Sequence, residues 1–81
     1  MPIDEAIAEL TARIKQVDPD AVIFVKKRSD EEASLRVYAN TDSEGAIKEA
    51  TQDFTLSLLT ADGLDVQVLV YDKATSLPPG M

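Results

Sequence analysis

The sequence predicts an α+β fold in which two helices pack on one face of a three-stranded mixed sheet, in the order α-β-β-α-β. Two segments repeat apolar residues every three or four positions, which is typical of amphipathic helices. Three shorter segments are either continuously apolar or alternate between apolar and polar residues, as strands do. Two helices with one apolar stripe each can cover one face of such a sheet and form a two-layer domain.

The first helix is expected between Pro2 and Asp18. Pro2 suits the first turn, where its missing N–H group removes no intrahelical hydrogen bond. Pro19 disfavours the α conformation in the residue before it, so the helix should end near Asp18. The apolar stripe of this helix consists of Ile3, Ile7, Leu10, Ile14 and Val17.

An antiparallel hairpin is expected next. The run from Ala21 to Val25 is apolar and largely β-branched, and a second run, from Ala33 to Asn40, alternates between apolar and polar residues. The short connection between them predicts that the two strands are antiparallel neighbours. The turn contains no Asn-Gly or Asp-Gly pair that would fix its geometry, so the sequence leaves the register of the hairpin open.

A second helix follows the hairpin. Its stripe consists of Ile47, Ala50, Phe54, Leu58 and Ala61, widened by Leu59. Asp42 or Ser43 is expected to cap its N-terminus, and Gly63 is expected to end it.

The last strand is predicted from Leu64 to Tyr71, where apolar residues again alternate along the chain. A right-handed crossover from the second strand through the helix places this strand parallel to the second one. The fold is therefore expected to occupy residues 1–73 as a single domain, with residues 74–81 as a flexible C-terminal tail. The element order resembles that of several small folds, including type II KH-like domains, BolA-like domains and a ferredoxin-like fold without its first strand. The chain lacks the Gly-x-x-Gly loop of KH domains and the histidine of BolA-like proteins, so the resemblance is one of topology and implies no function.

Composition excludes several classes of function. The chain has no cysteine and no histidine, so thiolate catalysis, disulfides and cysteine- or histidine-ligated metals are ruled out, and a cytoplasmic location is the default expectation. The net charge of −7 disfavours nucleic acid and anionic membranes as partners. No apolar run approaches the about 20 residues that span a bilayer, so no membrane association is expected.

Catalytic patterns are also missing from the sequence. Without histidine, a serine or threonine nucleophile needs a lysine or carboxylate base, and neither a Ser-x-x-Lys nor a Gly-x-Ser-x-Gly pattern occurs. The pairs Asp18/Asp20 and Asp62/Asp65 could bind calcium or magnesium weakly, but such residues more commonly form helix stops and turns. We therefore expect a non-enzymatic protein without cofactor or metal.

The sheet face opposite the helices is the candidate site. It is expected to present Arg36, Tyr38, Leu69 and Tyr71, joined by Phe24 and Lys26 if the hairpin register allows. Tyrosine, phenylalanine and arginine are enriched where proteins bind one another, so self-association, as a homodimer or larger homo-oligomer, or a protein partner is the favoured interpretation. The alternatives are an RNA- or single-strand-binding face and an enzyme whose site forms only between subunits.

The basic run Lys26-Lys27-Arg28 raises a separate question, because the chain is acidic overall. Asp30, Glu31 and Glu32 follow it across the turn and can neutralise it locally. A charged hairpin end also discourages edge-to-edge aggregation. The run is therefore expected to be a solvated hairpin tip, with docking to an acidic partner as the alternative.

Overall fold

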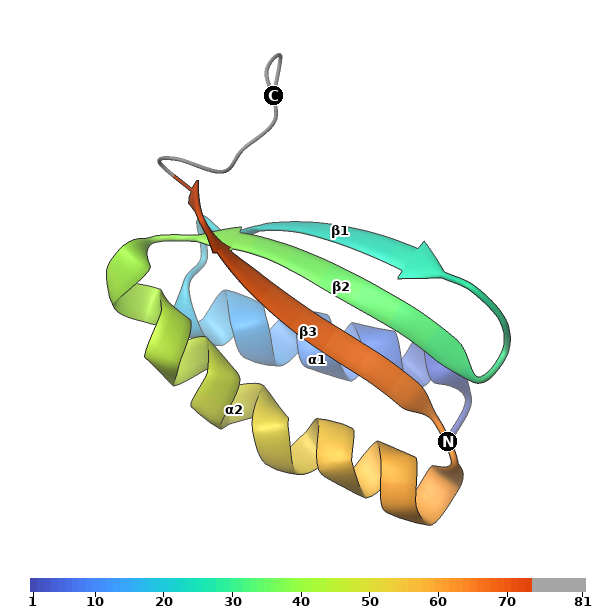
Figure 1. The fold of residues 1–81 in the computed structure, drawn as a ribbon. Coiled ribbons are helices and arrows are strands. Elements are labelled where there is room, and N and C mark those ends of the chain that lie inside the picture. The colour runs from blue at the N-terminus through green and yellow to red at the C-terminus, as the bar shows by residue number, and fades with distance from the viewer. Residues whose placement is uncertain (74–81) are drawn as a thin grey trace.

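The computed structural model describes residues 1–73, in which two helices lie on one side of a three-stranded sheet (Figure 1). The predicted α+β fold and its element order are confirmed. The expected tail, residues 74–81, lies outside the described residues. In chain order the elements are α1 (Ile3–Val17), β1 (Val22–Lys27), β2 (Glu32–Ala39), α2 (Glu44–Ser57) and β3 (Asp65–Asp72), with a 3-10 turn at Thr41–Ser43 and a π-helical turn at Leu58–Asp62.

The sheet has the strand order β1-β2-β3, so β2 is the only strand with a neighbour on both sides among residues 1–73. β1 is antiparallel to β2 and β3 is parallel to it, as the sequence predicts. The register that the sequence leaves open places Phe24 opposite Arg36 and Lys26 opposite Ser34. Since residues directly opposite each other share a face, Phe24 and Lys26 lie on the same side of the sheet as Arg36.

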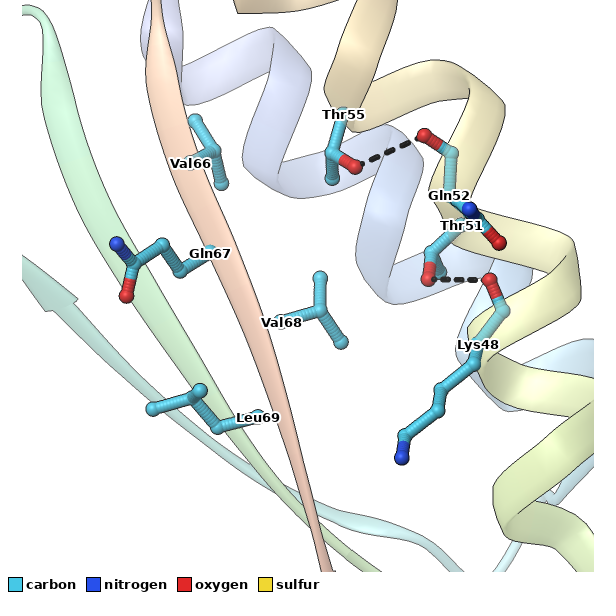
Figure 2. Close-up of a pocket in the computed structure, with 8 residues that line it drawn as sticks. All are labelled: Lys48, Thr51, Gln52, Thr55, Val66, Gln67, Val68 and Leu69. Carbon is cyan, nitrogen blue, oxygen red and sulfur yellow. Dashed lines mark hydrogen bonds between the residues drawn. The ribbon is translucent and has the colours of Figure 1, made fainter.

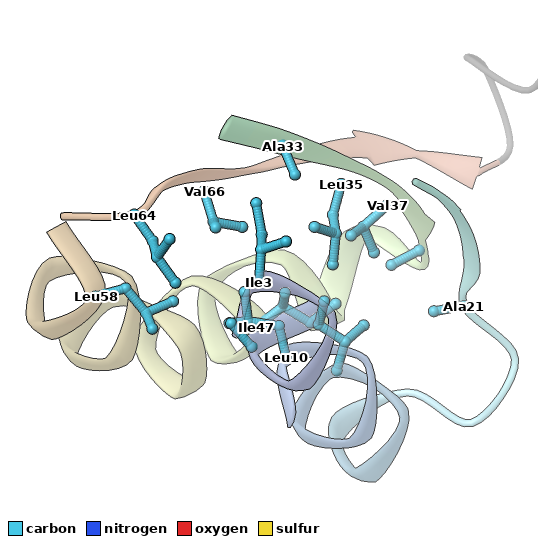
Figure 3. Close-up of a cluster of buried hydrophobic side chains, with 13 residues drawn as sticks. Ile3, Leu10, Ala21, Ala33, Leu35, Val37, Ile47, Leu58, Leu64 and Val66 are labelled. Atoms are coloured by element: carbon cyan, nitrogen blue, oxygen red, sulfur yellow. The ribbon is translucent and has the colours of Figure 1, made fainter. Parts of the chain in front are cut away.

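The core lies between the sheet and the helices, where side chains from both layers point toward each other (Figure 3). β2 contributes Leu35 and Val37, which are fully buried. Burying an aliphatic side chain of this size contributes about 1.5–3 kcal/mol to folding, so these contacts hold the helices against one face of the sheet. The larger side chains that meet them from the helices are Ile3, Leu10, Ile14, Ile47 and Leu58.

The buried side of α2 differs from the predicted stripe. Thr51 is buried, and its hydroxyl donates to the carbonyl of Ile47 at 2.9 Å, whereas Ala61 and Leu59 are exposed. The wider π-helical turn after α2 changes the angle at which successive side chains project, which takes Ala61 away from the core. Gly63 ends this turn at φ 67°, a left-handed conformation that suits glycine, so the predicted stop is confirmed.

The N-terminus of α2 also differs from expectation. Neither Asp42 nor Ser43 caps it with a side-chain hydrogen bond, because the 3-10 turn leads directly into the helix. Ser43 instead adopts a helical conformation as the residue before α2. The predicted cap is therefore wrong.

Asp18 ties the end of α1 to the end of β2. Its carboxylate is buried and accepts hydrogen bonds from the backbone N–H of Asn40 at 3.1 Å and of Asp20 at 3.0 Å. The Asn40 backbone bond is the main reason that the pKa of Asp18 is lowered, and it outweighs the opposing effect of burial. The Asp20 bond, a hydrogen bond with the Ser43 side chain and the charge of Lys73 lower the pKa further. The Asp18 carboxylate therefore has a structural role at this junction.

We expect Asp18→Asn to lower the free energy of unfolding by about 1–3 kcal/mol at neutral pH, because an amide cannot accept all of these bonds. A lowered pKa means that the carboxylate stabilises the fold fully above the unfolded-state pKa of about 3.9, and that this contribution is lost as pH falls through the folded-state value. The difference between wild type and Asp18→Asn in urea denaturation should therefore shrink below about pH 4. Asp42→Asn, at an exposed carboxylate, is the control; a difference that stays constant from neutral to acidic pH would contradict this role for Asp18.

Candidate functional site

The two helices leave one face of the sheet uncovered, and we call it the open face (Figure 1). Strand alternation and the observed register assign its residues. All six residues of the predicted site lie on it. The open face consists of Val22, Phe24 and Lys26 from β1, Glu32, Ser34, Arg36 and Tyr38 from β2, and Asp65, Gln67, Leu69 and Tyr71 from β3.

Three aromatic rings form a cluster across one end of the open face. The Phe24 and Tyr38 rings meet edge to face, with their centroids 5.7 Å apart. The Tyr38 and Tyr71 rings stack at 5.3 Å, with 24° between their planes. Tyr38 is consequently only 7% exposed, although the sequence predicts it to be an exposed aromatic. The outer members of the cluster, Phe24 and Tyr71, and the neighbouring Leu69 remain exposed.

Charged side chains occupy the other end of the open face. Lys26, Arg28 and Arg36 line a shallow hollow of about 110 Å³, together with the carboxylates of Glu32 and Asp65. None of these three cations forms a hydrogen bond or ion pair through its side chain within residues 1–73. The other five basic residues of the chain, Arg13, Lys15, Lys27, Lys48 and Lys73, all bond to protein oxygens.

The basic run in the hairpin therefore divides into two parts. Lys27 lies on the helix side of the sheet, where its ammonium pairs with Asp4 at 3.4 Å and Asp30 at 3.8 Å. Lys26 and Arg28 line the hollow on the open face instead. Of the three basic residues, only Lys27 therefore forms an ion pair with an acidic turn residue within residues 1–73, although the carboxylate of Glu32 lies in the same hollow as Lys26 and Arg28. Arg28, which follows the end of β1 and borders the hollow, is not among the site residues predicted from the sequence, because alternation along a strand does not place a residue beyond the strand's end.

No metal centre is found in the part of the chain that the structure describes. Residues 1–73 contain no group of three or more Asp or Glu side chains that could hold a metal ion. Asp62, one of the carboxylates considered from the sequence, lies 3.8 Å from the terminal amine of Met1. No helix within residues 1–73 is both long and apolar enough to cross a membrane.

Comparison of the chain with protein-family models, with curated proteins and with solved structures gave no match. The functional interpretation therefore depends on the geometry and chemistry of the open face.

Tyr38→Ala should destabilise the monomer, because Tyr38 is the buried centre of the aromatic cluster. We expect a loss of about 3 kcal/mol in the free energy of unfolding, measured by chemical denaturation. Tyr38→Phe keeps the ring and should cost under about 1 kcal/mol, since the Tyr38 hydroxyl has no hydrogen-bond partner within residues 1–73. Equal losses for the two variants would show that the ring contacts do not stabilise the fold.

Proposed function

We propose that the protein is a non-enzymatic binding module whose open face docks a protein partner. The observation that supports this most is the combination of an exposed apolar surface, formed by Phe24, Leu69 and Tyr71, with three unpaired cations beside it. Aromatic side chains on a rigid sheet lose little conformational entropy on binding, and such residues dominate protein interfaces energetically. The partner surface is expected to be apolar and bordered by carboxylates that face Lys26, Arg28 and Arg36.

A foreign partner avoids the like-charge contacts that one face-to-face dimer of the chain would make. A face-to-face dimer with its two-fold axis along β2 would place the β2 residues of each copy over their own counterparts. Arg36 would then lie near Arg36 of the other copy, and Glu32 near Glu32, so like charges would meet at the centre of the interface. Such contacts oppose association.

Phe24 and Val25 provide a matched test of this proposal. They are consecutive residues of β1 with similar exposure, 36% and 47%, but they lie on opposite faces of the sheet. The probes are peptides selected for binding to the wild-type protein from a random display library. Phe24→Asp should weaken their binding by about 30-fold or more, which is the usual effect of losing an aromatic anchor. Val25→Asp should leave the affinity unchanged.

Selected peptides are expected to combine apolar residues with Asp or Glu. Circular dichroism must show that both variants are folded. Peptides without acidic residues, or equal losses in the two variants, would contradict docking at the open face.

Single-stranded nucleic acid is the second candidate, because unpaired cations beside aromatic rings can hold a phosphate backbone and stack bases. Two features oppose it. The stacking of Tyr38 on Tyr71 leaves Tyr38 little free ring surface, and Glu32 and Asp65 lie among the cations. We therefore expect a fluorescent oligothymidine to bind more weakly than about 100 μM at about 150 mM salt, where non-specific contacts are screened. Tighter binding that Arg36→Glu abolishes would favour the nucleic-acid function instead.

A further inference from the structure

A groove runs along the free edge of β3, between that strand and α2 (Figure 2). Its volume is about 540 Å³. On the strand side the groove is lined by the apolar side chains of Val66 and Val68, while the side chains of Gln67 and Leu69 point away from α2; the helix wall is polar, with Lys48, Gln52 and Thr55. Because β3 is an edge strand, nothing within residues 1–73 pairs with the side of its backbone that faces this groove.

The direction of the unpaired backbone groups follows from one hydrogen bond. The N–H of Asp65 points toward β2, since it donates to the carbonyl of Glu31 at 2.8 Å. Backbone groups of successive residues in an extended strand point to alternate sides. The N–H and C=O groups of Val66, Val68 and Val70 are therefore directed away from β2, toward the free edge.

β3 also lacks the features that usually protect an edge strand. Natural edges are protected by charges, proline or bulges, and β1 carries Lys26 and Lys27. β3 pairs one to one with β2 over its whole length, without a bulge. Between Asp65 and Asp72 it has neither proline nor charge. An uncharged, regular edge of this length is a template for another strand.

We propose that β3 pairs with β3 of a second copy, antiparallel and about a two-fold axis at Leu69, so that two protomers share one six-stranded sheet. In this register Val68 of each copy exchanges backbone hydrogen bonds with Val70 of the other, which uses the outward-directed groups. It also brings Asp65 close to Lys73 of the second copy, the helical residue that directly follows β3, twice per dimer. Lys73 now donates to the exposed carbonyl of Asp20 at 2.8 Å, and a bond so accessible to water is readily exchanged for an ion pair.

The choice of a second copy rests on this charge arrangement. β3 has a negative residue at its first position, and a positive one directly follows its end, with uncharged residues between Asp65 and Asp72. Antiparallel pairing centred at Leu69 brings the first position of one strand beside Lys73, the residue that directly follows the other strand, so these opposite charges meet, while Asp72 lies opposite Val66. Registers centred at Val68 or Val70 do not bring Asp65 opposite Lys73.

The dimer would enlarge the docking surface. A two-fold axis perpendicular to the sheet keeps both open faces on the same side. Because neighbouring strands are spaced about 4.8 Å apart throughout, a six-stranded sheet presents a face twice as wide as that of one protomer. Dimerisation through β3 is independent of the proposed function, whereas the enlarged surface rests on it. Phe24 lies on β1, two strands from the new interface, so Phe24→Asp should lose partner binding and still dimerise.

A charge exchange tests the pairing and its register together. In sedimentation velocity of the full chain, the wild type should form a dimer of twice 8.8 kDa at micromolar to submillimolar concentration. Asp65→Lys and Lys73→Asp should each weaken the dimer about tenfold or more, because each places like charges opposite each other at two sites. The double variant should restore the wild-type dissociation constant to within about threefold.

Single cysteines provide a second measurement that does not depend on charge, since the chain has no natural cysteine. Leu69 would face its own counterpart in a non-hydrogen-bonded pair, where the Cα atoms are about 4.5 Å apart and a disulfide can form. Oxidised Leu69→Cys should yield a covalent dimer. Leu59→Cys, exposed on the turn after α2, and Phe24→Cys should not.

Several results would overturn the proposal. A monomer at every concentration would exclude the second copy as the occupant of the groove. Single charge variants that dimerise like the wild type, or a double variant that fails to recover, would exclude this register. A covalent dimer of Phe24→Cys would indicate face-to-face association through the open face.

Discussion

The rest of the structure depends on the position of β2 between two strands. Because β2 is paired on both sides, its side-chain alternation is fixed along its whole length. Leu35 and Val37 project into the core beneath the helices, while Arg36 and Tyr38 project from the opposite face. A shift of one residue in this strand would bury Arg36 and expose Leu35, at a cost that a domain of this size could not tolerate.

The same constraint separates stability from function. Every helix contact is made on one face of the sheet, so the open face is free to hold residues chosen for binding (Figure 1). Its aromatic end is rigid, because Tyr38 is held between Phe24 and Tyr71. Its charged end holds three cations that form no side-chain ion pair within residues 1–73, and the carboxylates of Glu32 and Asp65 lie among them. Within residues 1–73 the hollow therefore has more cations than carboxylates, an arrangement that we expect to favour carboxylate-bearing partners.

The sequence predicted the elements and the faces, because these depend on the local period of apolar residues. It also predicted the strand directions, because these follow from the short hairpin connection and from the handedness of the crossover. It could not predict the features that depend on contacts between distant residues. Tyr38 is buried only because two rings from neighbouring strands cover it, and Asp18 is held by Asn40, 22 positions away. Ala61 was misplaced because a π-helical turn has no clear sequence signature. The groove beside β3 depends on the position of β3 at the edge of the sheet, which follows from the strand order of the folded domain.

The most direct test of this account is to measure hydrogen exchange rates of individual backbone amides at low and high protein concentration. The measurement shows whether two copies of the protein associate through the free edge of β3. In the dilute monomer, the amides of Gln67 and Leu69, which point toward β2, should exchange slowly, and those of Val66, Val68 and Val70 should exchange fast. At concentrations where the dimer forms, Val68 and Val70 should become as protected as their neighbours. If their exchange stays fast while a dimer is present, the copies associate elsewhere and the edge of β3 is not the interface.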